Sequence, residues 1–163
     1  MEINKTVSNP MLAGAMQLIR ADGGQAQPAH HAMLLEQLDK AELLAPAEIT
    51  AEVDSEGNKL INEKAKVRFP ILNAPDGKRL FVLFTDSATI EMAKEKEDPN
   101  GLMKMYSQDT VVMRFSQMAG MLLSKNPDGS DNGIFGIILN PFMDNIVIPK
   151  ASIQKAHEMK TKE

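Results

Sequence analysis

The chain has 163 residues, of which 43% are hydrophobic and 25% are charged, as is typical of one soluble globular domain with its own core. The formal net charge of −4 excludes a global positive field that would draw the chain to nucleic acid or to an anionic membrane. The absence of cysteine excludes disulfides, thiolate nucleophiles and cysteine-ligated metal sites.

The N-terminal residues Met1 to Lys5 contain no basic stretch leading into an apolar segment, so the sequence predicts a cytoplasmic location. The longest apolar run, residues 134–139, is too short to span a bilayer. The 12 methionines are suited either to filling a core or to forming an adaptable binding surface, and their helical spacing favours the core.

Two helices are predicted near the N-terminus. The first covers residues 8–24, with Ser8 or Asn9 as its cap and Pro10 in its first turn, and its apolar stripe consists of Leu12, Ala15, Met16 and Ile19. The second covers residues 25–43, and its predicted buried face consists of Leu34, Leu35, Leu38 and Ala41.

Three strands are predicted next. Residues 47–53 alternate, which predicts one wet face and one buried face made of Ile49, Ala51 and Val53. Residues 63–71 alternate in the same way, and Pro70 indicates an edge position or the end of the strand. After a tight turn at residues 74–78, residues 79–85 are apolar on both faces and should lie inside the sheet.

The rest of the chain mixes short helices and strands. The predicted elements are a charged helix at 86–97, a strand at 110–115, a helix at 116–124, a surface loop at 126–133, strands at 134–139 and 145–149, and a terminal helix from Pro149. Ser116 is the predicted cap of the helix at 116–124, whose inward residues are Met118, Ala119 and Leu122.

This pattern favours an α+β fold. We expect a single domain with a mixed or antiparallel sheet of about five to six strands, covered by helices and accompanied by an N-terminal helical pair. Residues 1–28 are assigned to the first helix and a linker, and residues 29–163 to the α+β domain.

The three histidines offer little chemistry. His30 and His31 are helical neighbours, whose side chains point about 100° apart, so they are poorly placed to hold one metal ion and are expected to be exposed. His157 lies in the charged last helix and is expected to be solvated. The loop at 126–133 lacks the ligand alternation and the closing glutamate of a calcium loop, and we predict neither a metal nor a cofactor.

One candidate site lies where a buried strand meets a helix, at Thr85, Asp86 and Ser87. A helix N-terminus at such a point can hold an anion or a substrate carbonyl. The same residues also suit ordinary capping, in which Asp86 or Ser87 accepts the unpaired N–H groups of the first turn. Capping is the interpretation that we favour.

A second candidate lies in the polar break between the last two strands. Asn140 precedes a proline, and its side chain can bond to nearby backbone and stabilise a corner. We therefore predict a hairpin-like corner between two core strands. Phe142 and Met143 are predicted to form an apolar contact at its tip.

With these residues in place, the chain resembles the N-terminal domain of the SseB family. The resemblance rests on four pieces in a fixed order, LLEQLDKAELLAPA, FPILNAPDGKRLFVLFTDSATI, MRFSQMAGMLL and GIFGIILNPFMDNIVIP, within Met33 to Ile153. The family name refers to enhanced serine sensitivity, and the same label is attached to type III secretion proteins. The resemblance implies no catalytic residues, and it implies that relatives often carry a second, C-terminal domain.

The sequence therefore predicts a non-enzymatic domain that binds another protein, with neither nucleic acid nor a membrane as its partner. A homo-oligomer is left open. The alternative is a small-molecule-binding protein or a hydrolase with its site where Thr85, Asp86 and Ser87 meet Asn140. A concave pocket joining those residues would favour the alternative, whereas a methionine-bearing apolar patch would favour protein binding.

Overall fold

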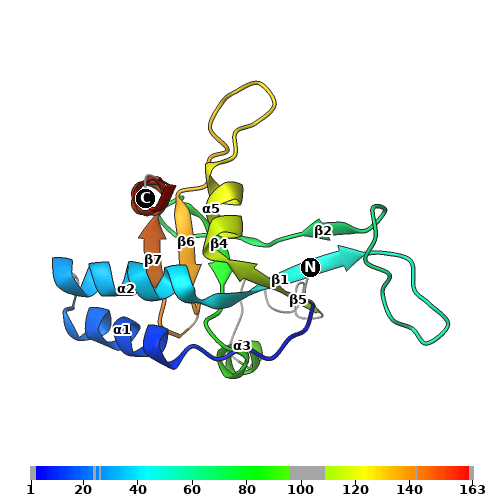
Figure 1. Cartoon of the computed structure of the whole chain (residues 1–163), viewed down its shortest axis with the longest axis horizontal. Coiled ribbons are helices and arrows are strands. Elements are labelled where there is room, and N and C mark those ends of the chain that lie inside the picture. Colours follow the sequence, from blue (N-terminus) through cyan, green and yellow to red (C-terminus); the bar gives the residue numbers. More distant parts are fainter. Residues whose placement is uncertain (1–2, 24, 26, 96–108, 142, 162–163) are drawn as a thin grey trace.

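The structure is a computed structural model that describes residues 3–23, 25, 27–95, 109–141 and 143–161 (Figure 1). Its elements in chain order are α1 (Pro10–Ala21), α2 (Pro28–Lys40), β1 (Glu42–Thr50), β2 (Lys66–Arg68), β3 (Ile71–Asn73), β4 (Arg79–Leu83), α3 (Ser87–Lys94), β5 (Asp109–Arg114), α5 (Phe115–Leu123), β6 (Gly136–Leu139), β7 (Ile146–Pro149) and α6 (Lys150–Thr161).

The strands form two sheets. One sheet has three antiparallel strands in the order β2-β1-β5, and the other has four strands in the order β3-β4-β6-β7, of which only β4 and β6 are parallel. Leu44 and Phe84 join the sheets through two main-chain hydrogen bonds of 2.9 and 2.8 Å. The α+β class is confirmed, although the described strands divide between two sheets instead of forming one.

The N-terminal helical pair is also confirmed, and α1 and α2 lie side by side in Figure 1. Each helix has its proline in the first turn, where the missing N–H has no helical partner to lose. Most of the predicted stripe residues are buried, namely Leu12, Ala15, Met16, Leu34, Leu38 and Ala41. The division of the chain at residue 28 stays a prediction.

The boundary between α2 and β1 differs from the prediction. The helix ends at Lys40, and β1 begins at Glu42, so the predicted helix is too long and the predicted strand at 47–53 starts and ends too late. The sequence around Leu43 suits a helix, but these residues are buried between neighbouring strands, and tertiary contacts override helical propensity. Val53, predicted to be buried, lies past the end of the strand and is 60% exposed.

Pro46 fits inside β1 for a specific reason. The N–H and C=O of Leu44 point away from β5, because they bond to Phe84 in the other sheet. Main-chain groups alternate in direction along a strand, so Pro46, two residues later, also has no ladder bond to β5 to lose. Its register partner there is Thr110.

The predicted strand at 63–71 is divided in two. β2 ends at Arg68, Pro70 is buried between the strands, and β3 begins at Ile71 in the other sheet. β2 and β3 are each an edge strand of their sheet, as the proline indicated.

β4 occupies an inner position between β3 and β6, and four of its five residues are buried. This confirms the prediction from its doubly apolar pattern. β6 and β7 form the predicted antiparallel pair, with Ile137 opposite Ile148 in the core. β4 and β6 run parallel, so residues 84–86 and residue 140 meet at the same edge of the sheet.

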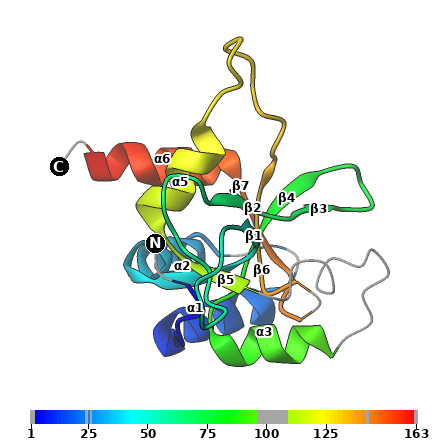
Figure 2. The same ribbon diagram turned by 90° about the vertical axis from the view of Figure 1, so that its right-hand side faces the viewer.

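Helix α5 begins at Phe115, one residue earlier than the predicted helix at 116–124. Its cap is Arg114, whose N–H donates to Gln117 Oε1 at 3.0 Å, and the predicted cap Ser116 lies exposed in the first turn. The predicted inward residues Met118, Ala119 and Leu122 are all buried. In Figure 2, α5 and α6 lie together on one side, and the loop between α5 and β6 extends away from the body of the protein.

Candidate functional site

The structure brings three of the predicted site residues together at the ends of β4 and β6. Asn140 is 1% exposed; its Oδ1 accepts a hydrogen bond from the N–H of Thr85 at 2.9 Å, and its Nδ2 donates to Thr85 Oγ1 at 3.0 Å. The same Nδ2 donates to Asp144 Oδ2 at 2.8 Å. Thr85 Oγ1 in turn donates to Asp86 Oδ2 at 3.2 Å, so the cluster is bonded internally.

Asp86 and Ser87 are also engaged with the main chain. Asp86 Oδ1 accepts the N–H of Thr89 at 3.0 Å, which makes Asp86 the cap of α3. Ser87 Oγ accepts the N–H of Val7 at 3.0 Å, and Ser87 N–H donates to Val7 O at 3.1 Å. These bonds tie the N-terminal segment to the start of α3.

The polar break after β6 is a turn in the described structure. Asn140 adopts a φ of 51° and Asn145 a φ of 52°, and the N–H of Asn145 donates to Asn140 O at 3.1 Å to close the hairpin. Asparagine tolerates this left-handed conformation better than most residues. Met143 is half-buried in the turn, whereas Phe142 lies outside the described residues.

The histidines depart from the prediction, because His30, His31 and His157 are all half-buried. His30 Nδ1 lies 2.7 Å from Asp22 Oδ2, and the Asp22 side chain is only 7% exposed, so this histidine joins a pair that links the two N-terminal helices. The hydrogen bond from His30, aided by the N–H of Gln27, holds the pKa of Asp22 below its ordinary value. His157 is half-buried rather than solvated, with its ring 6.5 Å from that of Phe115.

Asp109 is one of several carboxyl groups whose pKa is lowered by nearby hydrogen-bond donors. Burial raises its pKa, but hydrogen bonds from Lys59 Nζ at 2.7 Å and Asn4 Nδ2 at 3.0 Å outweigh that effect and lower the pKa overall. The pKa is also lowered at Asp22, Glu42, Asp76, Asp128 and Asp131. These six carboxylates are spread over loops and strand ends and do not form one reactive cluster.

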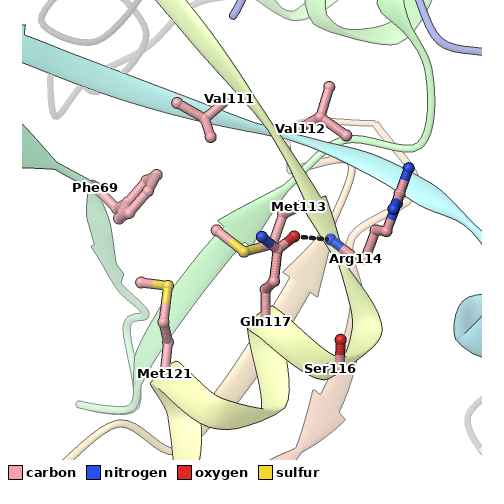
Figure 3. A pocket seen from close by; sticks show the side chains of 8 residues that line it. All are labelled: Phe69, Val111, Val112, Met113, Arg114, Ser116, Gln117 and Met121. Atoms are coloured by element: carbon pink, nitrogen blue, oxygen red, sulfur yellow. Dashed lines mark hydrogen bonds between the residues drawn. The ribbon is translucent and has the colours of Figure 1, made fainter. Parts of the chain in front are cut away.

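The most distinctive open surface is a hollow of about 610 Å³ between the end of β5, the first turns of α5 and the segment joining β2 to β3. We call it the methionine hollow; its lining is Phe69, Val111, Val112, Met113, Arg114, Ser116, Gln117 and Met121. Figure 3 shows Phe69, Met113 and Met121 around one side of it. Met113 comes from the strand and Met121 from the helix, so a strand–helix junction creates the surface.

The sequence contained a partial signal for this hollow. Met121 lies off the inward positions of its helix, Met118, Ala119 and Leu122, and it is 36% exposed. Phe69 and Met113 gave no such signal, because their alternation is that of ordinary strand residues.

The polar lining of the methionine hollow is nearly as extensive as its apolar lining. It consists of Arg114, Ser116 and Gln117, and Gln117 already accepts the N–H of Arg114, as the dashed line in Figure 3 marks. This lining offers neither a paired acid and base nor a nucleophile beside a base. Within residues 3–95 and 109–161, apart from the gaps given above, no three His, Asp or Glu side chains gather in a way that could hold a metal ion. No helix in that part of the chain is long and apolar enough to cross a membrane.

A family model described as the SseB protein N-terminal domain matches residues 15–155. The match extends beyond the stretch that carried the resemblance in the sequence and includes part of α1. Searches of curated proteins and of solved structures found no match.

Proposed function

Because the chain belongs to the SseB family through its N-terminal domain, we propose that it is a non-enzymatic cytoplasmic domain that binds another protein. The observation that carries this proposal is the methionine hollow, a concavity in which Phe69, Met113 and Met121 lie beside a polar lining of nearly the same extent. Such surfaces are used for protein recognition more often than for catalysis when no acid, base or nucleophile accompanies them.

The lining suits an apolar anchor residue from a partner. Met121 is unbranched and partly exposed, so it can adjust its rotamer around an inserted side chain, while Phe69 supplies a rigid wall. Burial of one large apolar anchor contributes about 1.5–3 kcal/mol, which is the scale of an interface hot spot.

Arg114 adds a preference for a negatively charged group on the partner. It lies at the rim with its side chain 62% exposed, and its contact with Glu42 is a loose one of 3.9 Å. A guanidinium in this position can form a bidentate pair with a carboxylate of a partner. We therefore expect the partner to present an apolar side chain next to an aspartate or glutamate.

The alternative, a small-molecule site or hydrolase at Thr85, Asp86, Ser87 and Asn140, has less support. All four side chains are occupied by hydrogen bonds to one another or to the main chain. A ligand would have to displace bonds that hold β4, β6 and α3 in place. The methionine hollow requires no such disruption.

The test compares Met121→Glu with Met92→Glu. Both residues are partly exposed methionines on helices, but Met92 lies on α3 and does not line the hollow. Affinity capture from the native cell, followed by mass spectrometry, should identify partners that Met121→Glu loses and Met92→Glu retains. Circular dichroism of both variants checks that the fold is intact.

A second measurement locates the binding surface directly. With methyl-labelled methionine, addition of the captured partner should shift the signals of Met113 and Met121 and leave that of Met92 unchanged. If no protein is enriched, and a metabolite that is lost on Ser87→Ala co-purifies instead, the alternative site replaces the proposed function.

A further inference from the structure

A second concave surface lies on another part of the protein. It is a groove of about 690 Å³ between α2 and α6, with Phe115 of α5 also in its lining. Figure 2 shows α2, α5 and α6 on one side of the molecule. We call it the α2–α6 groove, and it shares no lining residue with the methionine hollow.

The apolar part of the groove combines small residues with a projecting one. Ala32 on α2 and Ala156 on α6 leave space between the helices, and Leu35 and Phe115 add apolar area. Met159, one helical turn beyond Ala156, is 62% exposed at the rim. The surface thus combines a recess beside Ala32 and Ala156 with the projecting apolar side chain of Met159.

The two helices give the groove opposite charges. Glu36 and Asp39 line it from α2, and Lys155 lines it from α6. Within the described residues, Glu36 forms an ion pair with the exposed Lys40 of its own helix, at 3.3 Å. No carboxylate of the described part of the chain lies within ion-pair distance of Lys155.

We propose that a second copy of this chain binds in the α2–α6 groove and forms a two-fold symmetric dimer. In a two-fold interface the same patch contacts itself, so every contact occurs twice and the patch must be self-complementary. The acidic side of each groove faces Lys155 of the other copy, and Met159 of each copy enters the other groove beside Ala32. Each groove contains both the acidic and the basic members of these ion pairs. This favours a second copy of the chain over a partner that carries one sign of charge.

The test reverses each charge separately and then combines the variants. Lys155→Glu places three acidic groups in both grooves, and Glu36→Lys with Asp39→Lys places three basic groups there. We expect each variant alone to weaken self-association by about tenfold or more, since two exposed pairs are turned repulsive at once. An equimolar mixture should restore dimerisation, because each groove then meets a partner of opposite charge.

The measurement is sedimentation velocity of the full chain over a range of concentrations. Lys64→Glu is the matched control: it makes the same charge change on an exposed residue outside the groove, and it should dimerise like the wild type. All substituted side chains are at least partly exposed, and circular dichroism verifies that the variants are folded.

Two results would overturn the inference. One is a wild-type chain that stays monomeric up to about 1 mM, the concentration at which even weak association is populated. The other is a wild-type dimer that neither charge variant weakens, since the dimer would then use another face. Met121→Glu should dimerise normally, so the outcome is separate from that of the proposed function.

Discussion

Asn140 holds the main chain of Thr85 although the two residues are 55 positions apart in the sequence. Its amide both accepts from the Thr85 N–H and donates to the Thr85 hydroxyl, at 2.9 and 3.0 Å. The two residues follow β6 and β4, which are parallel neighbours, so this single side chain joins the ends of two core strands. The buried polar residues of this region therefore serve the fold.

We expect Asn140→Ala to reduce the free energy of unfolding by about 2–5 kcal/mol. The substitution leaves the buried N–H of Thr85 unpaired, at about 1–3 kcal/mol, and places alanine at a positive φ, at about 1–2 kcal/mol. Chemical denaturation measures the loss.

Asn145→Ala is the control for this prediction. Asn145 has nearly the same φ, but it is exposed and does not bond to Thr85. The loss at Asn145 should therefore be smaller than at Asn140, and its conformational part is about 1–2 kcal/mol. Equal losses in the two variants would show that the bonds to Thr85 contribute nothing to stability.

Gly136 is the glycine at which β6 and β7 approach most closely. A Cβ added there would lie 2.2 Å from Ile148 O and 2.9 Å from the Cα of Pro149, and both are backbone atoms that cannot move aside without shifting β7. We expect Gly136→Ala to cost at least about 3 kcal/mol, or to prevent folding, because the strand pair must separate.

Gly120→Ala tests the same substitution where there is space. A Cβ at this position on α5 meets nothing within 4 Å, and alanine is a better helix former than glycine. Its thermal midpoint should rise, in keeping with a gain of about 0.5–1 kcal/mol. A comparable loss in both variants would mean that the close approach of β6 and β7 is not the cause.

Asp22→Asn should make the protein less stable at pH 7 and no less stable than wild type at low pH. The hydrogen bond from His30 lowers the pKa of Asp22 in the folded state, so the carboxylate stabilises the fold above its ordinary pKa near 4. That stability is lost as the pH falls through the lowered pKa. The urea midpoint of Asp22→Asn should therefore lie below that of the wild type at pH 7. Near pH 2 the two midpoints should coincide.

Glu63→Gln serves as the control for charge, since it removes one carboxylate from an exposed position. If the urea midpoints of Asp22→Asn and Glu63→Gln agree at both pH values, the pair of Asp22 with His30 adds nothing to stability beyond the effect of net charge.

Asp86→Ala should lower stability by about 1 kcal/mol, because α3 loses the oxygen that accepts the Thr89 N–H. Asp86→Asn should stay close to wild type, since asparagine caps helices as well as aspartate does. Hydrogen exchange in α3 reports the effect locally. Protection of α3 that Asp86→Ala leaves unchanged would contradict the capping role.

Local patterns in the sequence determined much of the architecture. The helical stripe around Leu12 and Met16 and the doubly apolar β4 report which faces of an element are buried, and Pro70 marks the end of a strand. Such patterns need no knowledge of the neighbouring element, because the periodicity of apolar residues follows the local geometry of a helix or strand. The hairpin corner after β6 was predicted from a different local rule, the conformational restriction of Asn140 by the proline that follows it.

Only the tertiary structure decided what each buried face meets. The residues around Leu43 favour a helix locally, yet contacts with β5 and Phe84 make them a strand. In the same way, the partner of Asn140, the methionine hollow and the α2–α6 groove arise from elements distant in the chain. Periodicity specifies that a side chain points inward, but the energy of a contact depends on which two surfaces pack, and only the complete fold brings those surfaces together.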